Sequence, residues 1–195
     1  MFEVFETYIQ AMGNFTRDDL QLMRSLSSGK KVRRRQHLLQ EGEVSQHKIF
    51  IAKGLLRTYV RREDGAEYIM RFAPENNWAA DYESFTHQTP AKANIDALED
   101  TEVILWTREN FGALSASIPA FKSFLDEFLA SNLRAGYDRI RMNISATAEE
   151  KYRDFITSHP DVFRRVPLHM VASYLGVSRE TLSRVRHAQV KQGRG

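Results

Sequence analysis

The 195-residue sequence predicts an α+β protein: an N-terminal β jelly-roll barrel with flanking helices, then a long helix, then a C-terminal helix-turn-helix. Three observations predict it. Short strand-like runs separated by turns fill residues 32–107, an apolar stripe at helical spacing fills residues 118–145, and a two-helix pattern with a glycine corner follows. Hydrophobic residues make up 42% and charged residues 27%, which is typical of a folded protein. We expect three parts, residues 1–117, 118–145 and 146–195.

Two helices are expected before the first strand. The apolar residues of the first recur at spacings of three and four: Phe2, Phe5, Ile9 and Met12. Thr16, followed by a basic and two acidic residues, is a typical N-cap for the second helix. Gly29 marks the end of this helical region.

The strand region is rich in β-branched and aromatic residues. Its predicted strands are residues 48–52, 55–60, 67–72 and 101–106. Asp64-Gly65 between two alternating runs is typical of a hairpin turn. Many short strands at this spacing favour a barrel or a double-sheet jelly roll. The basic run 30–35 is interpreted as an exposed turn and strand face.

The long helix is predicted to start at Pro119, a residue favoured at the first position of helices. Its apolar stripe continues to Ile144, which makes an amphipathic helix of about 25 residues and about 37 Å. The stripe can pack on the helix's own barrel or on the same helix of a second copy. Since the helix is long for one small barrel to cover, we favour a homodimer.

The C-terminal part is basic. Residues 146–195 hold nine Lys or Arg and five acidic side chains, whereas the preceding residues are close to neutral. Thr147 and Glu150 have the spacing of a capping box, which opens a helix that is broken at Pro160. A basic end beside a neutral body indicates a polyanionic partner there.

The most specific pattern is a helix-turn-helix. The first helix has one apolar face: Leu168, Val171, Ala172 and Leu175. Gly176 can adopt the left-handed conformation that ends this helix, Val177 fills the corner, and Ser178 can cap the second helix. A generic two-helix corner with solvated arginines is the alternative interpretation.

The second helix is predicted to bind double-stranded DNA through its outward face. The candidate residues are Ser178, Arg179, Glu180, Thr181, Ser183, Arg184 and Arg186. Arginine can bond bidentately to O6 and N7 of guanine, and glutamate can accept from N4 of cytosine. Ser178 and Thr181 are placed for phosphate contacts.

These residues carry a resemblance. Ser178-Arg179-Glu180-Thr181-Leu182-Ser183-Arg184 resembles the recognition-helix signature of the Crp/Fnr family, bacterial regulators related to the cyclic-AMP receptor protein. Gly42, Lys53-Gly54 and the Asp64-Gly65 hairpin follow the same order, so the resemblance covers roughly residues 15–190. It implies a cyclic-nucleotide-binding-like jelly roll, a dimerisation helix and a DNA-binding winged helix. It also implies that the positions of Arg179, Glu180 and Arg184 read bases.

The sequence departs from the family in two places. Ala91 stands where cyclic-AMP-binding members carry the phosphate-binding arginine, and Lys92 would point to the other face of a strand. We therefore expect a small-molecule effector other than cyclic AMP, or no effector. The candidate effector-pocket residues are Trp78, Tyr82, Glu83, Lys92 and Asn94; a core role for the aromatic residues is the alternative. Residues 189–195 are too short for the two strands of a wing, which is therefore absent or vestigial and supplies few phosphate contacts.

Several classes of protein are excluded. Without cysteine there are no disulfides and no thiolate-bound metal or iron–sulfur clusters, which suits the cytoplasm. No run approaches about 18 apolar residues, so we expect no membrane span. The first residues contain Glu3 and Glu6 and lack a basic start, so we expect no signal peptide. No catalytic or nucleotide-binding motif occurs, and the histidines lack ligand spacing. We therefore predict no enzyme activity, no metal and no cofactor.

The function predicted from the sequence is a dimeric, sequence-specific, cytoplasmic transcription regulator. Two recognition helices would read half-sites about 34 Å apart. Two alternatives stay open. One is a jelly-roll (cupin-like) metal-dependent enzyme in which His37, His47 and His87 converge from separate turns. The other is a ligand-binding module whose DNA binding has degenerated.

Overall fold

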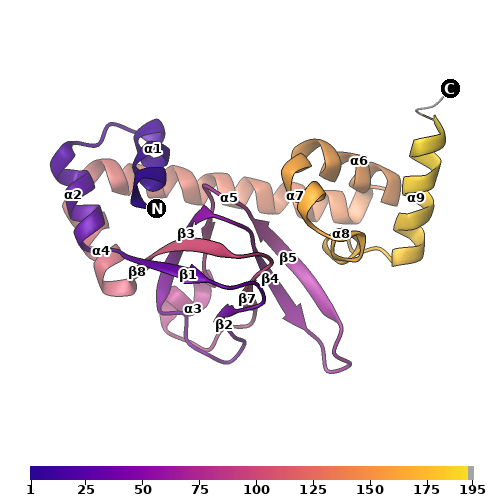
Figure 1. Ribbon diagram of the computed structural model, residues 1–195, viewed down its shortest axis with the longest axis horizontal. Helices are drawn as coiled ribbons and strands as arrows, with labels where there is room; N and C mark the ends of the chain where they lie inside the picture. The colour runs from indigo at the N-terminus through magenta and orange to yellow at the C-terminus, as the bar shows by residue number, and fades with distance from the viewer. Residues whose placement is uncertain (193–195) are drawn as a thin grey trace. The chain divides into compact units, whose positions relative to one another are not determined.

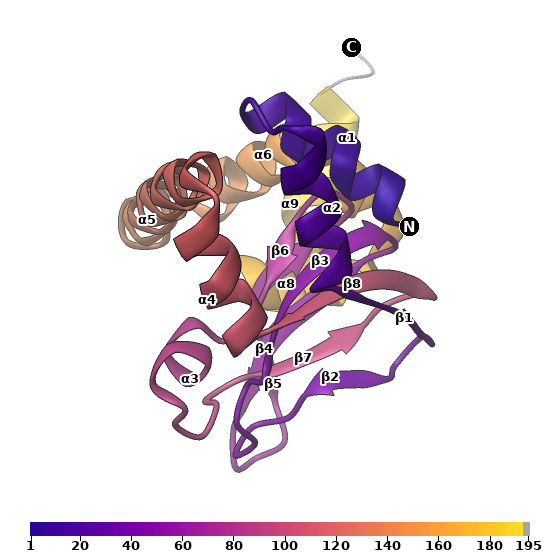
Figure 2. The ribbon, with the colours of Figure 1, turned by 90° about the vertical axis from the view of Figure 1, so that its left-hand side faces the viewer.

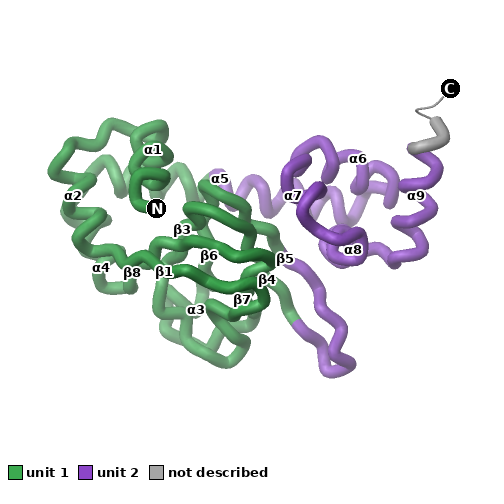
Figure 3. The backbone as a smooth tube through the Cα atoms, viewed as in Figure 1, with its two compact units in different colours: residues 1–60, 71–130 green, residues 61–70, 131–195 purple. Residues whose placement is uncertain are grey.

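The computed structural model describes residues 1–192; residues 193–195 lie outside the described part. Figure 1 shows its helices and strands. The chain divides into two compact units (Figure 3). The sheet unit contains residues 1–60 and 71–130, and the helical unit contains residues 61–70 and 131–195.

The sheet unit begins with two helices, as predicted. They are α1 (Phe2–Met12) and α2 (Arg17–Ser25). Thr16 caps α2 in a capping box: its hydroxyl accepts from the Asp19 N–H, and the Asp19 carboxylate accepts from the Thr16 N–H. The local sequence signal at Thr16 therefore fixes where the second helix starts.

The strands form two four-stranded sheets, seen from the side in Figure 2. They are β1 (Ser28–Val32), β2 (His37–Leu39), β3 (His47–Lys53), β4 (Leu56–Arg61), β5 (Glu67–Ala73), β6 (Trp78–Ala79), β7 (Asn94–Ala97) and β8 (Thr101–Thr107). One sheet has the order β1-β8-β3-β6, and the other has the order β2-β7-β4-β5. The jelly roll is confirmed, but the prediction of a barrel is corrected: in the described chain no strand pairing joins the two sheets, so they stack face to face.

The neighbouring strands β8 and β3 of the β1-β8-β3-β6 sheet are buried on both faces. On β3, Phe50 and Ala52 pack toward the helices, whereas Ile49 and Ile51 pack toward the second sheet. β8 alternates in the same way. This double burial explains why these two strands have continuous apolar runs.

Helices cover the outer face of this sheet. α4 (Arg108–Ser117) follows β8, and α5 (Pro119–Ser145) begins at the predicted proline. Side chains from α1, α2, α4 and the start of α5 form one core with β3, β6 and β8. Trp106 on β8 is fully buried there, and its indole N–H donates to the Met23 carbonyl at 3.0 Å. The short helix α3 (Tyr82–His87) lies between β6 and β7 in the chain.

A buried ion pair joins neighbouring strands of the second sheet. The Arg57 guanidinium on β4 donates to both carboxylate oxygens of Asp96 on β7, at 2.8 and 2.9 Å. The guanidinium also lies 4.0 Å from the centre of the Tyr59 ring. The Arg57 and Asp96 side chains are only 10% and 6% exposed. This bidentate geometry is the kind that holds a charge pair away from water.

The helical unit contains four C-terminal helices. They are α6 (Ala148–Ser158), α7 (Pro160–Arg165), α8 (Leu168–Leu175) and α9 (Arg179–Gln192). The predicted capping box at the start of α6 is present, since Thr147 and Glu150 exchange hydrogen bonds. The buried side chains of these helices form a small core: Tyr152, Phe155, Val162, Val166, Val171, Ala172, Leu175 and Leu182.

The start of β5 belongs to the helical unit and packs against its helices. The Ser173 hydroxyl on α8 accepts from the Ile69 N–H at 3.0 Å and donates to the Glu67 carbonyl at 2.7 Å. The Arg139 guanidinium on α5 donates to the carbonyls of Ile69 and Tyr174 at 3.2 and 3.1 Å.

Among residues 1–192, no helix is both long enough and apolar enough to cross a membrane.

Candidate DNA-binding surface and sensor cleft

The corner between α8 and α9 is built as the sequence predicts. Gly176 ends α8 with a φ of +67°, a conformation that glycine adopts without steric cost. The Val177 N–H donates back to the Ala172 carbonyl at 3.1 Å. The Ser178 hydroxyl then accepts from the Thr181 N–H at 3.1 Å and caps α9. Local hydrogen bonds therefore set the position of the first turn of α9.

The predicted DNA-binding residues lie together on the first two turns of α9. Arg179, Glu180, Arg184 and Arg186 are exposed, as is Ser178 at the cap. Thr181 and Ser183 are half-buried. At about 100° per residue, Arg186, Arg179, Ser183, Glu180 and Arg184 fall within an arc of about 160°. Leu182 is fully buried and lies about 120° around the helix from the centre of that arc, so it anchors the helix and leaves the arc open.

Local hydrogen bonds contact the charged side chains of Glu180 and Arg184 on this surface. Hydrogen bonds from its own backbone N–H and from the Ser178 side chain lower the pKa of Glu180, so this carboxylate stays ionised at neutral pH. The Arg184 guanidinium donates to the Thr181 hydroxyl at 3.4 Å. The face therefore offers cationic donors and one anionic acceptor side by side, the combination needed to read guanine and cytosine edges.

The predicted short wing has no strand within the described chain. α9 continues to Gln192, so residues 189–192 extend the helix. Residues 193–195, the rest of that predicted segment, lie outside the described residues.

The five predicted effector-pocket residues are divided between the core and the surface. Trp78 is buried in the core, against Phe5 and Phe50. Lys92 and Glu83 form a surface ion pair at 2.8 Å, with side chains 75% and 58% exposed. Asn94 is buried and its amide oxygen accepts from the Glu41 N–H. Tyr82 is exposed on α3 and lines a cleft described below.

Ala91, at the expected arginine position, packs into an aliphatic layer between the two sheets. Its N–H donates to the Glu43 carbonyl at 2.7 Å, and its carbonyl accepts from the Gly42 N–H at 2.9 Å. The surrounding side chains include Leu39, Ile49 and Ile95. An anionic phosphate buried beside these groups would receive no ion pair from Ala91.

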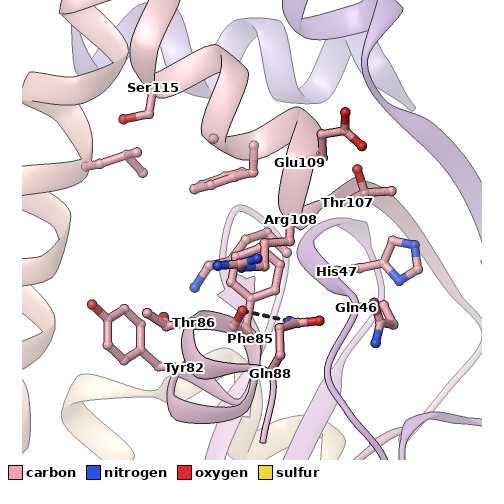
Figure 4. Close-up of a pocket in the computed structure, with 14 residues that line it drawn as sticks. Gln46, His47, Tyr82, Phe85, Thr86, Gln88, Thr107, Arg108, Glu109 and Ser115 are labelled. Carbon is pink, nitrogen blue, oxygen red and sulfur yellow. Dashed lines mark hydrogen bonds between the residues drawn. The ribbon is translucent and has the colours of Figure 1, made fainter.

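The sheet unit also has an open cleft, which no pattern in the sequence predicted. It has a volume of about 960 Å³ and lies among the start of β3, α3, α4 and the start of α5 (Figure 4). Lys48 lines it and shares the face of β3 that carries Phe50 and Ala52. Its ammonium lies 5.1, 4.9 and 6.0 Å from the ring centres of Tyr82, Phe85 and Phe111.

Burial and the nearby Arg71 lower the pKa of Lys48 to about 8. Within the described residues, no carboxylate pairs with this ammonium. The signal that could have identified Lys48 is the alternation along its strand, because a charge stands at a position that shares a face with the apolar Phe50 and Ala52.

Replacing Lys48 by Met is expected to stabilise the sheet unit at neutral pH. Below pH 8 the lysine is charged in the folded and unfolded states, and its burial costs about 1–3 kcal/mol after the rings offset part of the penalty. Between pH 8 and 10.5 the unfolded chain binds more protons, so the stability of the parent protein rises with pH.

Urea unfolding of the parent and of Lys48→Met at several pH values measures this effect. The difference in unfolding free energy is expected to be largest near pH 7 and to shrink toward pH 10. A difference that stays constant over this range would contradict the burial of a charged lysine, since the other titrating groups are common to both proteins.

The histidines proposed for a metal-dependent enzyme do not gather. His37 is hydrogen-bonded to the Tyr59 hydroxyl at 3.0 Å, His47 lines the cleft, and His87 ends α3. In the described part of the chain, no group of three His, Asp or Glu side chains is arranged to hold a metal ion. The geometry therefore offers nothing in favour of the metal-enzyme alternative.

Comparisons with known proteins agree with this architecture. Residues 29–117 match the family described as "Cyclic nucleotide-binding domain". The cyclic AMP receptor protein of Thermus thermophilus is 24% identical over 162 residues, which cover 80% of this chain and 74% of that protein. The structure of FixK2 from Bradyrhizobium japonicum matches with a TM-score of 0.73 at 20% identity and 86% coverage of each chain. A protein of Eubacterium rectale, described as a transcriptional regulator of the crp/fnr family, matches with a TM-score of 0.70 at 15% identity, covering 91% of this chain and 85% of that one.

Fold and site thus define a class of protein, in which a two-sheet domain of the cyclic nucleotide-binding type precedes a helix-turn-helix. Within this class the chain has the fold of the Crp/Fnr family of transcription regulators, and the resemblance predicted from the sequence is confirmed.

Proposed function

We propose that this protein is a homodimeric, sequence-specific transcription regulator that places α9 in the major groove of double-stranded DNA. The observation that carries the proposal is the exposed face of α9, on which Arg179, Glu180 and Arg184 lie free of the protein core. A capped helix that presents such a face with its N-terminus first suits the major groove. Ser178 and Thr181 at the cap are placed for phosphate contacts.

The part of α5 from Leu129 onward supports the dimer. It exposes five large apolar side chains: Leu129 at 50%, Leu133 at 60%, Tyr137 at 66%, Ile140 at 57% and Ile144 at 81%. Their spacings of three and four put them on one stripe of the helix, the pattern of a coiled-coil seam. A symmetric pairing of this stripe would bury it and bring two α9 helices to half-sites about 34 Å apart.

In this proposal the predicted parts have separate tasks. Residues 1–117 sense a small-molecule effector, residues 118–145 join the two copies, and residues 146–195 bind DNA. The effector would act by shifting an equilibrium between two arrangements of the dimer. A regulator with no cysteine and a chromosomal target would work in the cytoplasm.

Arg184→Ala tests the assignment of base reading to α9. The variant is expected to bind a selected operator about 5- to 150-fold more weakly, which corresponds to about 1–3 kcal/mol for a bidentate base contact. Binding to random DNA is expected to change little, because it depends on phosphate contacts. Fluorescence anisotropy with both DNAs measures the two affinities at one salt concentration.

Arg17→Ala is the matched control, since Arg17 is exposed on α2 and its loss removes the same charge. Equal weakening on both DNAs by Arg184→Ala would show a phosphate contact and contradict base reading. If the parent protein shows no salt-dependent binding to any selected DNA, the ligand-binding module with degenerate DNA binding is the better function.

A further inference from the structure

We propose that the cleft beside Lys48 binds a small aromatic carboxylate, with its carboxylate against the Lys48 ammonium and its ring against Tyr82. This inference goes beyond the proposed regulator: it assigns a site and a ligand class, and it does not depend on DNA binding. It also places the ligand outside the layer between the sheets, which aliphatic side chains fill.

The Lys48 ammonium favours an anionic ligand. Burying an ammonium without an anionic partner is unfavourable, and three aromatic rings replace only part of its hydration. The lysine nevertheless lines an open cleft, and its hydrogen-bonding capacity is not used by another residue of the described chain. A carboxylate entering the cleft would supply the missing partner.

The net charge of the side chains that line the cleft favours a monoanion. Lys48 and Arg108 are cationic and Glu109 is anionic, all three lining the same opening. Burial and the nearby Lys30 lower the pKa of His47, which is therefore neutral at pH 7. The lining thus carries a net charge of about +1, which a monoanion neutralises and a dianion would exceed.

The walls of the cleft favour a ligand with an aromatic ring. Tyr82 is 57% exposed at the side of the cleft, and Phe85, Phe111 and Leu125 add apolar surface. Figure 4 shows Tyr82, Thr86 and Gln88 on one side and Arg108 and Glu109 on the other. Aromatic walls with a few polar groups favour a flat ligand, and a volume of about 960 Å³ is within the range of small-molecule sites.

Calorimetric titration of the full chain with four probes tests the proposal. The probes are benzoate, phenyl phosphate, benzyl alcohol and benzylamine, which share a ring and differ in charge. We expect benzoate to bind, and we expect benzyl alcohol, phenyl phosphate and benzylamine each to bind at least tenfold more weakly. Lys48→Met is expected to weaken benzoate at least tenfold, whereas Lys48→Arg keeps the charge and retains part of the affinity.

Lys122→Met is the matched control, since Lys122 is exposed on α5 and lies outside the cleft. Thermal unfolding of each variant confirms that it is folded before titration. Benzylamine binding as well as benzoate, or unchanged benzoate affinity in folded Lys48→Met, would overturn the proposal. Tighter binding of phenyl phosphate would overturn the assignment of a carboxylate, and no benzoate binding at millimolar concentration would overturn the site. None of these outcomes bears on DNA binding, which the Arg184→Ala experiment tests separately.

Discussion

Replacing Leu133 and Ile140 together by lysine is expected to convert the dimer into a monomer and to lower operator affinity more than a hundredfold. The two residues are seven apart on α5, so they occupy equivalent positions of the exposed stripe. In a symmetric dimer each lysine would face a second lysine across the two-fold axis, in a seam that excludes water. The stripe could then no longer be buried.

DNA affinity falls with the dimer because two linked recognition helices bind one operator as a single unit. Once the first α9 is bound, the second meets its half-site at an effective concentration set by the dimer, which is commonly millimolar. A monomer loses that advantage and keeps only the affinity of one half-site. Sedimentation velocity gives the oligomeric state, and anisotropy on full operators and on single half-sites separates the two effects.

Ser131→Lys combined with Ala135→Lys is the matched control for this pair. Both positions are exposed on α5, and they lie about 160° around the helix from Leu133. The control adds the same charge to the helix, yet it is expected to remain a dimer with unchanged operator affinity. Leu133→Lys with Ile140→Lys remaining dimeric would place the interface on another surface and would contradict the proposed role of the stripe.

Arg57→Met is expected to destabilise the sheet unit by about 3–5 kcal/mol, because it leaves the Asp96 carboxylate buried without its partner. Asp96 is 4% exposed, and each of its two carboxylate oxygens accepts a hydrogen bond from the Arg57 guanidinium. Arg57→Met combined with Asp96→Leu removes both charges and is expected to recover most of the lost stability.

Denaturant unfolding of the single and double variants measures these free energies. Lys92→Met is the control, because it breaks the exposed Glu83–Lys92 ion pair and is expected to cost less than about 1 kcal/mol. If Arg57→Met costs no more than this control, the buried pair does not stabilise the sheet. A double variant as unstable as the single one would show that the loss comes from arginine packing rather than from the unpaired carboxylate.

Elements with a strong local signal were predictable from the sequence. Thr16 and Thr147 start α2 and α6 through capping boxes that need only four consecutive residues. Gly176 and Ser178 fix the corner before α9 in the same local way. The candidate DNA-binding residues follow from that corner, because helical periodicity then decides which side chains face outward.

Short strands were harder to predict. β2 has three residues and β6 has two, which is too few for any periodicity to show. They exist because β7 and β3 supply hydrogen-bonding edges beside them. Strand spacing favoured a barrel or a double-sheet jelly roll without deciding between them, because strand pairing is set by the three-dimensional arrangement; the structure has two separate sheets.

By itself, the sequence determined the helix-turn-helix, the exposed face of α9 and the long helix with its apolar stripe, because each is encoded by residues a few positions apart. Only the tertiary structure decided that Ala91 lies in an aliphatic layer, that Arg57 pairs with Asp96, and that Lys48 meets three aromatic rings in a cleft. The three rings around Lys48 come from residues 34 to 63 positions away in the chain, and Asp96 lies 39 positions from Arg57. Burial and charge pairing depend on such distant partners, which no local spacing specifies.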